Sequence, residues 1–375
     1  MREIFANTYR NKKIIVTGHT GFKGSWLAHW LVLQGAEVLG ISLPPDTSPN
    51  HFGLLQSKIQ SLYIDIRNYE ELFEAFSQFK PDIVFHLAAQ PLVRKSYVAP
   101  RETYETNVIG TMNVLEASRH SKSVRSIVSI TTDKVYDNKE WQWGYREIDN
   151  LGGHDPYSSS KACAEILCES YRKSFFNDSS SGAGILMATV RAGNVIGGGD
   201  WSEDRLIPDA VKAAYTNQPT IIRNPKSIRP WQHVLEPIYA YLLIGQKLIE
   251  RKNEFSTAWN IGPVNEKDWS VKEVMDYSNE CWSNIVIETP EQDQNKVYHE
   301  ARNLKLDCSK AIQHLGWTPT WDTKKALEKT ILWYKDFYEN NQLNTDNDIK
   351  DFIKETIQKQ SRNEIPVNLK LVANS

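Results

Sequence analysis

The sequence has few of the features that mark secreted, metal-binding or nucleic-acid-binding proteins. Its 375 residues carry 44 Lys and Arg against 46 Asp and Glu, a net charge of −2. This balance excludes a broadly cationic surface and, with it, most non-specific binding to nucleic acid. Cysteines are scarce and match neither a CxxC pair nor metal-ligand spacing, which favours a reducing compartment and no metal site. They are Cys163, Cys168, Cys281 and Cys308.

Long apolar runs are missing as well. The opening residues, MREIFANTYRNKK, contain no apolar core, so we expect no secretory signal. The longest apolar stretch, residues 238–249, is broken by Gly245, Gln246 and Lys247, which argues against a membrane span. We therefore expect a cytoplasmic protein whose partners include neither a membrane nor a nucleic acid.

The first half of the chain alternates short β-branched runs with helix-length segments. This pattern predicts βαβ units and a doubly wound parallel (Rossmann) sheet covered by helices on both faces, an α/β fold. Strands are expected at residues 13–17, 37–42, 62–65, 83–87, 125–131 and 184–191, and helices at residues 24–34, 69–79, 103–118 and 157–175.

The alternation weakens after about residue 195. We expect a Rossmann domain at residues 11–195, to which residues 231–262 return, and a smaller mixed α/β substrate lobe mainly at residues 196–335. The polar composition of residues 340–375 predicts an appended helix and a loose tail.

A glycine-rich loop follows the first expected strand and opens the first expected helix. Gly18 permits a tight turn, Gly21 lets the backbone approach a pyrophosphate, and Gly24 allows close packing of helix on strand. The N–H groups and partial positive charge of a helix N-terminus favour phosphates. This context predicts a dinucleotide site. The other loop residues assigned to it are His19, Phe22 and Lys23.

The residue that usually selects the cofactor is absent. The second strand runs into Ser42-Leu43-Pro44-Pro45, with no acid for a ribose 2′-OH and no Arg or Lys for a 2′-phosphate, which modestly favours NAD over NADP. Asp65, which ends the expected third strand, and Ile66 next to it are placed to meet the adenine, although Asp65 is equally suited to cap a helix. Small residues end the fourth strand beneath the nicotinamide side: Leu87, Ala88, Ala89 and Gln90.

A tyrosine and a lysine share one helical face. Tyr157 and Lys161 are spaced i, i+4, one turn apart. Tyrosine, with a pKa of about 10, is a poor base at neutral pH, but a neighbouring ammonium lowers that pKa. Such a phenol can take a hydroxyl proton while hydride leaves the same carbon for NAD. The fifth strand delivers Thr132, Asp133 and Lys134 to the carboxyl edge of the sheet, where α/β ligand sites form.

Together these motifs resemble the extended short-chain dehydrogenase/reductase family. The glycine loop, the Leu87-Ala-Ala-Gln90 segment, Asn107, Thr132 and the Tyr157–Lys161 pair lie where that family has them, which adds Asn107 to the cofactor site. Within the family, residues 132–136, 191–201, 229–234 and 315–319 look most like the nucleotide-sugar 4,6-dehydratases, and the likeness spans roughly residues 11–335. It implies NAD as cofactor and CDP-glucose as substrate.

The resemblance implies an internal redox cycle. Tyr157 takes the proton of the sugar 4-OH while NAD accepts the C4 hydride, and Thr132 holds the same oxygen. A base then removes the C5 proton, Asp133 protonates the departing 6-OH, and the hydride returns to C6. Sister enzymes carry Glu as the C5 base where this chain has Lys134. Whether Lys134 is the base or stabilises the enolate stays open.

Polar residues of the second lobe are candidates for the nucleotide diphosphate. Asn194 offers an amide, and the guanidinium groups of Arg205 and Arg229 match phosphate geometry, with surface salt bridges as the alternative. Tyr298 is a candidate for closing over the nucleotide.

Two other functions share this scaffold. A nucleotide-sugar epimerase uses the tyrosine and lysine but needs no acid for a leaving hydroxyl. A non-catalytic NAD-sensing protein often loses one of the pair, and this chain keeps both. The resemblance further implies a homodimer or homotetramer that serves deoxysugar synthesis of the lipopolysaccharide O-antigen type.

Overall fold

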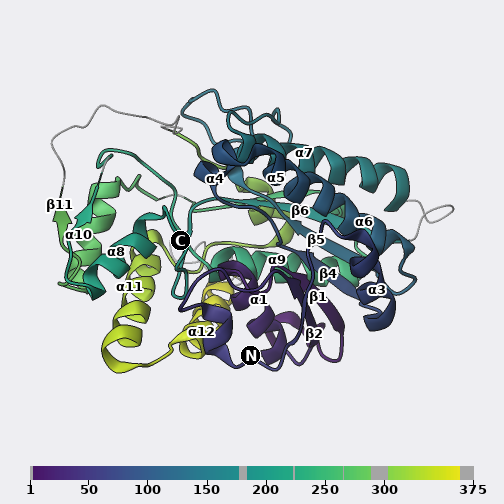
Figure 1. Ribbon diagram of the computed structural model, residues 1–375, viewed down its shortest axis with the longest axis horizontal. Coiled ribbons are helices and arrows are strands. Elements are labelled where there is room, and N and C mark those ends of the chain that lie inside the picture. Colours follow the sequence, from purple (N-terminus) through teal and green to yellow (C-terminus); the bar gives the residue numbers. More distant parts are fainter. Residues whose placement is uncertain (1–2, 177–183, 223, 265, 289–302, 364–375) are drawn as a thin grey trace, which may run out of the picture.

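A seven-stranded parallel sheet forms the centre of the protein (Figure 1). The structure is a computed structural model that describes residues 3–176, 184–222, 224–264, 266–288 and 303–363. All neighbouring strands of the sheet pair in parallel. In spatial order they are β10 (Ala258–Ile261), β6 (Leu186–Ala192), β5 (Ser126–Ile130), β4 (Ile83–His86), β1 (Lys13–Thr17), β2 (Glu37–Ser42) and β3 (Gln60–Tyr63).

Helices cover both faces of this sheet, which confirms the predicted doubly wound class. One face packs on α1 (Phe22–Leu33) and α9 (Leu235–Ile249), and the other on α3 (Tyr69–Phe79), α6 (Gly110–His120) and α7 (Pro156–Tyr171). Strand β1 shows why: Ile14 and Val16 join the first layer of core residues, whereas Ile15 between them joins the second.

The structure refines the predicted boundaries at two places. The third strand is Gln60–Tyr63 rather than residues 62–65, because Asp65 turns the chain and accepts the Asn68 N–H at 2.9 Å. The helix expected at residues 103–118 is three elements: α5 (Pro100–Tyr104), a π-helical turn at Glu105–Ile109, and α6.

The second half of the chain adds smaller elements around α11 (Thr323–Asn340). At the left end of Figure 1 lie α8 (Leu206–Tyr215), α10 (Val271–Cys281) and the strand pair β8 (Thr220–Ile221) and β11 (Ile287–Glu288). A second pair joins β7 (Val195–Ile196) to β9 (Gln232–His233). The remaining short helices include α2 (His51–Leu55) and α4 (Val93–Val98).

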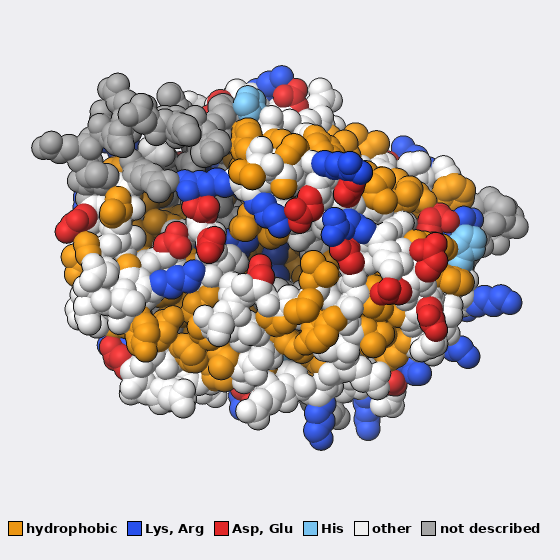
Figure 2. All heavy atoms as spheres, viewed as in Figure 1, with side chains coloured by type: hydrophobic (Ala, Val, Ile, Leu, Met, Phe, Trp, Pro, Cys, Tyr) orange, Lys and Arg blue, Asp and Glu red, His pale blue; other side chains and the backbone are white. Residues whose placement is uncertain are grey.

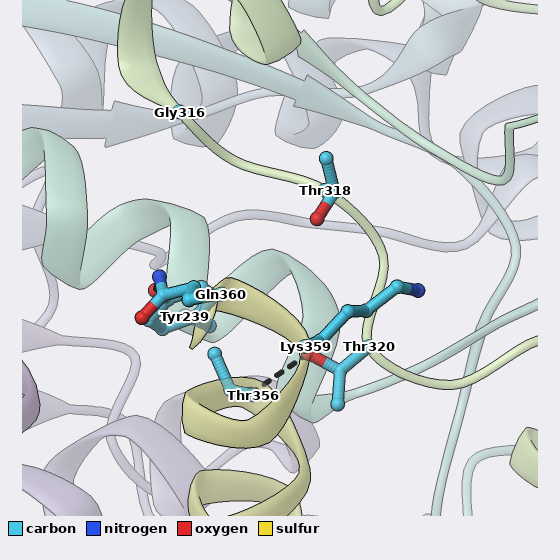
Figure 3. Close-up of a pocket in the computed structure, with 7 residues that line it drawn as sticks. All are labelled: Tyr239, Gly316, Thr318, Thr320, Thr356, Lys359 and Gln360. Carbon is cyan, nitrogen blue, oxygen red and sulfur yellow. Dashed lines mark hydrogen bonds between the residues drawn. The ribbon is translucent and has the colours of Figure 1, made fainter. Parts of the chain in front are cut away.

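Helix α12 (Thr345–Asn363) is packed into the body of the protein. Its Phe352 ring meets Trp30 of α1 and Tyr239 of α9 at centroid distances of 6.0 and 5.9 Å. Between α12, α9 and the loop at residues 316–320, which precedes α11, remains a crevice of about 10 Å³, room for about one water molecule (Figure 3). Within the described residues, no helix is both long and apolar enough to cross a membrane.

Candidate active site

The glycine loop after β1 has the shape of a phosphate cradle. Gly18 has a φ of +76°, and a Cβ there would lie 2.7 Å from the Ala88 N. A Cβ on Gly24 would lie 2.0 Å from the Gly18 O. Gly21 is the N-cap of α1, and no side chain caps the helix there. The N–H groups of the first turn therefore stay open to a phosphate bound at this end of the helix. These features fit a dinucleotide.

The predicted residues after β4 lie beside this loop. The Thr17 hydroxyl accepts the N–H groups of Leu87 and Ala88 at 3.1 and 3.2 Å. The Asn107 side chain accepts the Gln90 N–H at 2.8 Å and donates to the Gln90 O and to the Ser160 Oγ at 3.1 and 2.9 Å. Asn107 therefore braces the end of β4 against α7.

His19 and Lys23 point in different directions from the loop. The buried His19 imidazole bonds the Ser61 Oγ at 2.8 Å and meets the Phe52 ring at 4.8 Å. Burial lowers the pKa of His19 to about 4, so the ring is neutral at pH 7. Lys23 faces the catalytic residues: burial, then Arg205 and Lys161, lower its pKa to about 8.

Asp65 and Ile66 lie just after β3, which ends at Tyr63, rather than at the end of the strand as predicted. The Asp65 carboxylate bonds Arg67, with Oδ2 2.6 Å from Nη2, and this bond lowers the pKa of Asp65. The cap of α3 is Asn68, whose side chain accepts the Glu71 N–H, rather than Asp65. The buried Ile66 side chain fits against Gly110, where a Cβ would lie 2.5 Å from it.

Four of the five predicted catalytic residues form one cluster. The Asp155 side chain caps α7 by accepting the Ser158 N–H at 2.9 Å, which fixes Tyr157 in the first turn. The Tyr157 phenol lies near Thr132, whose hydroxyl lowers the pKa of the phenol. The Thr132 hydroxyl in turn donates to the Asp133 Oδ1 at 2.9 Å. The same oxygen lies 3.5 Å from the Lys134 Nζ.

Asp133 occupies a slot that the motifs did not reveal. A Cβ on Gly193 would lie 1.9 Å from the Asp133 Oδ2, so this carboxyl fits only beside glycine. Asp133 is 1% exposed, and its Oδ2 has no hydrogen-bond partner among the described residues. Because a buried polar atom without a partner is costly, the geometry suits an oxygen that bonds a substrate.

The charges around Tyr157 differ from the simple tyrosine–lysine picture. Burial raises the pKa of Tyr157, whereas Lys134, the Thr132 hydrogen bond and Arg205 lower it. Lys161 is the residue predicted to lower the pKa of Tyr157. Its ammonium donates a hydrogen bond to the Ile130 O at 3.1 Å, and burial lowers the pKa of Lys161 to about 8. Lys134 thus acts on the phenol as well as on Asp133.

The predicted substrate residues divide between the cluster and a larger cavity. Arg205 bonds the Asp200 Oδ2 at 2.8 Å, and the electrostatic effect of its charge reaches Tyr157. Arg229 lies with Asp133 along a cavity of about 360 Å³, within the usual size of ligand sites. On the face drawn in Figure 2, acidic and basic side chains surround a central hollow. Asn194 precedes β7, and Tyr298 lies outside the described residues.

Comparison with known proteins identifies the family. The family model described as GDP-mannose 4,6 dehydratase matches residues 15–330. The chain belongs to this family. The chain is also 48% identical over 332 residues to the CDP-glucose 4,6-dehydratase of Salmonella typhimurium, covering 88% of this chain and 92% of that protein.

More distant members of the dehydratase family and its fold relatives have other activities. The CDP-paratose 2-epimerase of Salmonella typhi is 27% identical, covering 86% of this chain and 98% of that protein. Among solved structures, dTDP-glucose 4,6-dehydratase from Streptomyces venezuelae with NAD bound has a TM-score of 0.71 at 21% identity, covering 86% of this chain and 97% of that one. UDP-glucose 4-epimerase from Thermotoga maritima has a TM-score of 0.73 at 22% identity, covering 87% and 100%. These structures share the extended short-chain dehydrogenase/reductase fold.

Proposed function

We propose that this dehydratase-family member converts CDP-glucose to CDP-4-keto-6-deoxyglucose with NAD as its cofactor. The observation that carries the proposal is the Tyr157–Thr132–Asp133–Lys134 cluster, which joins the groups for an oxidation and a dehydration in one site. The nucleotide and the sugar follow from the 48% identity to the Salmonella typhimurium enzyme.

Oxidation at C4 depends on the Tyr157 side of the cluster. NAD, held by the glycine loop and residues 87–90, supplies a hydride acceptor when bound. Tyr157 takes the 4-OH proton at its phenol oxygen, and the Thr132 hydroxyl orients the same sugar oxygen. Lys134 and Arg205 favour the phenolate by lowering the pKa of Tyr157.

Loss of water depends on Asp133 and Lys134, the other two members of the cluster. The new C4 ketone acidifies the C5 proton, and the Asp133 Oδ2 protonates the departing 6-OH. An ammonium has no lone pair, so Lys134 is a base only after it gives up a proton. While paired with Asp133 at 3.5 Å, it instead suits stabilisation of the enolate oxygen. An epimerase expels no hydroxyl, so its chemistry needs neither the Asp133 carboxyl nor the Lys134 ammonium.

Turnover of CDP-, dTDP-, GDP- and UDP-sugars in parallel tests the proposal. We expect CDP-glucose to react fastest and to give the enolate absorbance of a 4-keto-6-deoxy sugar in alkali. A product that keeps its 6-OH but has the inverted configuration at a ring carbon of the sugar would establish an epimerase instead. Binding of NAD with no reduction of the cofactor and no alteration of any sugar would favour a sensing protein.

The remaining assignments are proposals of the same kind. We propose that Asp65 and Ile66 contact the adenine and that Arg205 and Arg229 contact the nucleotide diphosphate. Asn194 is assigned to a diphosphate or sugar oxygen, and Tyr298 is assigned to close over the nucleotide. Scarce cysteines support a cytoplasmic setting. Exposed apolar side chains on one side, Val98, Tyr104, Ile109 and Ile166, support a homodimer or homotetramer. We place the product in deoxysugar synthesis of the lipopolysaccharide O-antigen type.

The cradle makes Gly18→Ala informative. An alanine there meets a φ of +76° and a Cβ 2.7 Å from the Ala88 N, so the loop must move. We expect the Kd for NAD, measured by calorimetry, to rise at least about 10-fold, since losing one backbone hydrogen bond to a charged phosphate costs about 1.5–3 kcal/mol. Gly316→Ala is the control: its φ is +69°, but nothing lies within 4 Å. Equal NAD affinity in both variants would contradict this role of Gly18.

The pKa of Lys23 predicts a pH dependence of NAD binding. This pKa is lowered to about 8 in the free protein, and a nearby diphosphate raises it, so binding takes up a proton. NAD affinity should therefore be highest below pH 8 and fall above it, by at most about tenfold per pH unit for one proton. Calorimetry in two buffers measures the proton uptake, and Lys23→Met should lower it. Unchanged uptake in that variant would place Lys23 away from the diphosphate.

A further inference from the structure

A buried ion pair lies behind the catalytic cluster. Glu165 follows Lys161 by one turn of α7, and Arg191 lies on β6, two residues before Gly193. Their side chains are 2% and 4% exposed, and the Glu165 Oε2 lies 2.9 Å from the Arg191 Nη2. Each member of the pair is therefore close in sequence to an active-site residue, Glu165 to Lys161 and Arg191 to Gly193.

Glu165 joins α7 to the two central strands. Its Oε1 accepts the hydroxyl of Thr131, the residue before Thr132, at 2.5 Å. Its Oε2 accepts the hydroxyl of Thr189 on β6 at 2.8 Å. The helix that carries Tyr157 is thereby fixed to the strand end that carries Thr132.

Arg191 holds the far end of the catalytic segment. Its Nη1 donates to the Tyr136 phenol oxygen at 2.8 Å and to the Glu147 O at 3.1 Å. The Tyr136 phenol donates onward to the Asn260 Oδ1 of β10 at 2.7 Å. Asp133 and Lys134 lie between two anchors, Thr131 bound to Glu165 and Tyr136 bound to Arg191.

Stability alone is a poor explanation for this pair. Removing two charges from water costs about as much as their attraction returns, and apolar replacements of buried pairs are often neutral or stabilising. The Arg191 Nε has no hydrogen-bond partner in the described part of the chain. The arrangement is therefore not the most stable filling of this space, but it fixes three backbone segments relative to one another.

We propose that Glu165, Arg191 and Tyr136 are positioning residues that hold Asp133 and Lys134 in register with the Tyr157 face of α7. They touch neither substrate nor cofactor. The Glu165 anchor serves the Thr132 end, where oxidation occurs, and the Arg191–Tyr136 anchor serves the Asp133–Lys134 end, where water is lost. This division rests on the proposed dehydratase function.

Tyr136→Phe tests the second anchor with little threat to folding. The ring keeps its stack on Tyr145 at 5.0 Å and its contact with the Arg191 guanidinium, and only the phenol oxygen is lost. In a single turnover with NAD and CDP-glucose, hydride uptake from C4 should stay within about twofold of the parent. Elimination should slow by roughly 10- to 100-fold, the cost of a displacement of about 1 Å, so that reduced cofactor accumulates.

Hydrogen exchange supplies a readout that does not depend on activity. Amides of residues 132–136 should exchange faster in Tyr136→Phe, whereas those of α7 should be unchanged. Tyr171→Phe, which removes a phenol bonded to the Glu116 Oε1 at 2.7 Å on the same helix, should leave exchange in this segment and both reaction steps at parental values.

Three results would overturn the proposal: parental elimination in Tyr136→Phe, equal slowing of both steps, or unchanged exchange of the segment. Failure of the parent itself to dehydrate CDP-glucose would count against the proposed function instead, and the exchange comparison would still decide whether Tyr136 holds the segment.

Discussion

Tyr157→Phe is expected to abolish hydride transfer from C4 while leaving the Kd for the nucleotide sugar nearly unchanged. Only the phenol oxygen is removed, and that oxygen is the group that takes the 4-OH proton. Loss of a positioned general base costs about 10²- to 10⁴-fold in rate. Absorbance of reduced NAD in a single turnover measures the step, and calorimetry measures binding.

Tyr241→Phe is the matched control for that variant. Its phenol is fully buried, and its oxygen has no hydrogen-bond partner among the residues described, so the same atom is deleted without breaking a contact. We expect parental hydride transfer. Reduction of bound NAD at the parental rate by Tyr157→Phe would show that another group takes the proton.

The pH profile of hydride transfer separates the two lysines. Lys134 lowers the pKa of Tyr157, so Lys134→Met should raise that pKa and move the rising limb of the profile to higher pH. Lys161→Met should lose rate with a smaller displacement of the limb, because Lys161 bonds the Ile130 O. A larger displacement in Lys161→Met would restore the simple tyrosine–lysine pair.

Local patterns were sufficient to predict the sheet and the glycine turn after its first strand. β-Branched runs between glycine-rich turns predict strands such as Lys13–Thr17, and the structure has that strand at those residues. Likewise the turn at Gly18 needs a positive φ, and a glycine directly after a strand predicts such a turn because glycine adopts positive φ readily. The edge strand Gln60–Tyr63 was misplaced because its end depends on a turn at Asp65.

Contacts between distant residues could not be predicted in this way. Glu165 and Arg191 are 26 residues apart, and no local pattern around either residue predicts their ion pair. His19 and Lys23 both belong to the glycine loop, yet one packs under α2 and the other faces the catalytic residues. Which residue of a loop turns inward is decided by the neighbouring helix and strand. The same holds for Gly193, whose missing side chain leaves space for Asp133.

Asp133→Asn should separate oxidation from elimination. Asparagine keeps the shape that fits beside Gly193 and can still accept the Thr132 hydroxyl, but its amide cannot protonate a leaving hydroxyl. We expect normal formation of reduced NAD and a 4-keto-glucose intermediate, followed by loss of water at least about 100-fold slower, the low end for a missing general acid. If the variant folds and binds substrate but fails to reduce NAD, Asp133 serves the first step instead.

Lys134→Met then decides how the C5 proton leaves. Lys134 and Asp133 are 3.5 Å apart, so a small approach of the two groups would let one proton pass from the ammonium to the carboxylate and create an acid and a base together. If Lys134 is the base, both elimination and exchange of the C5 hydrogen with deuterated solvent should fall in Lys134→Met. If exchange persists while elimination slows, the ammonium stabilises the enolate and a different group removes the proton. A single turnover in deuterated water, following reduced NAD by absorbance and C5 deuterium by mass spectrometry, distinguishes these outcomes. Asp133→Asn is the reference because it also removes the group that takes the Lys134 proton, so its C5 exchange should fall under the first assignment and persist under the second.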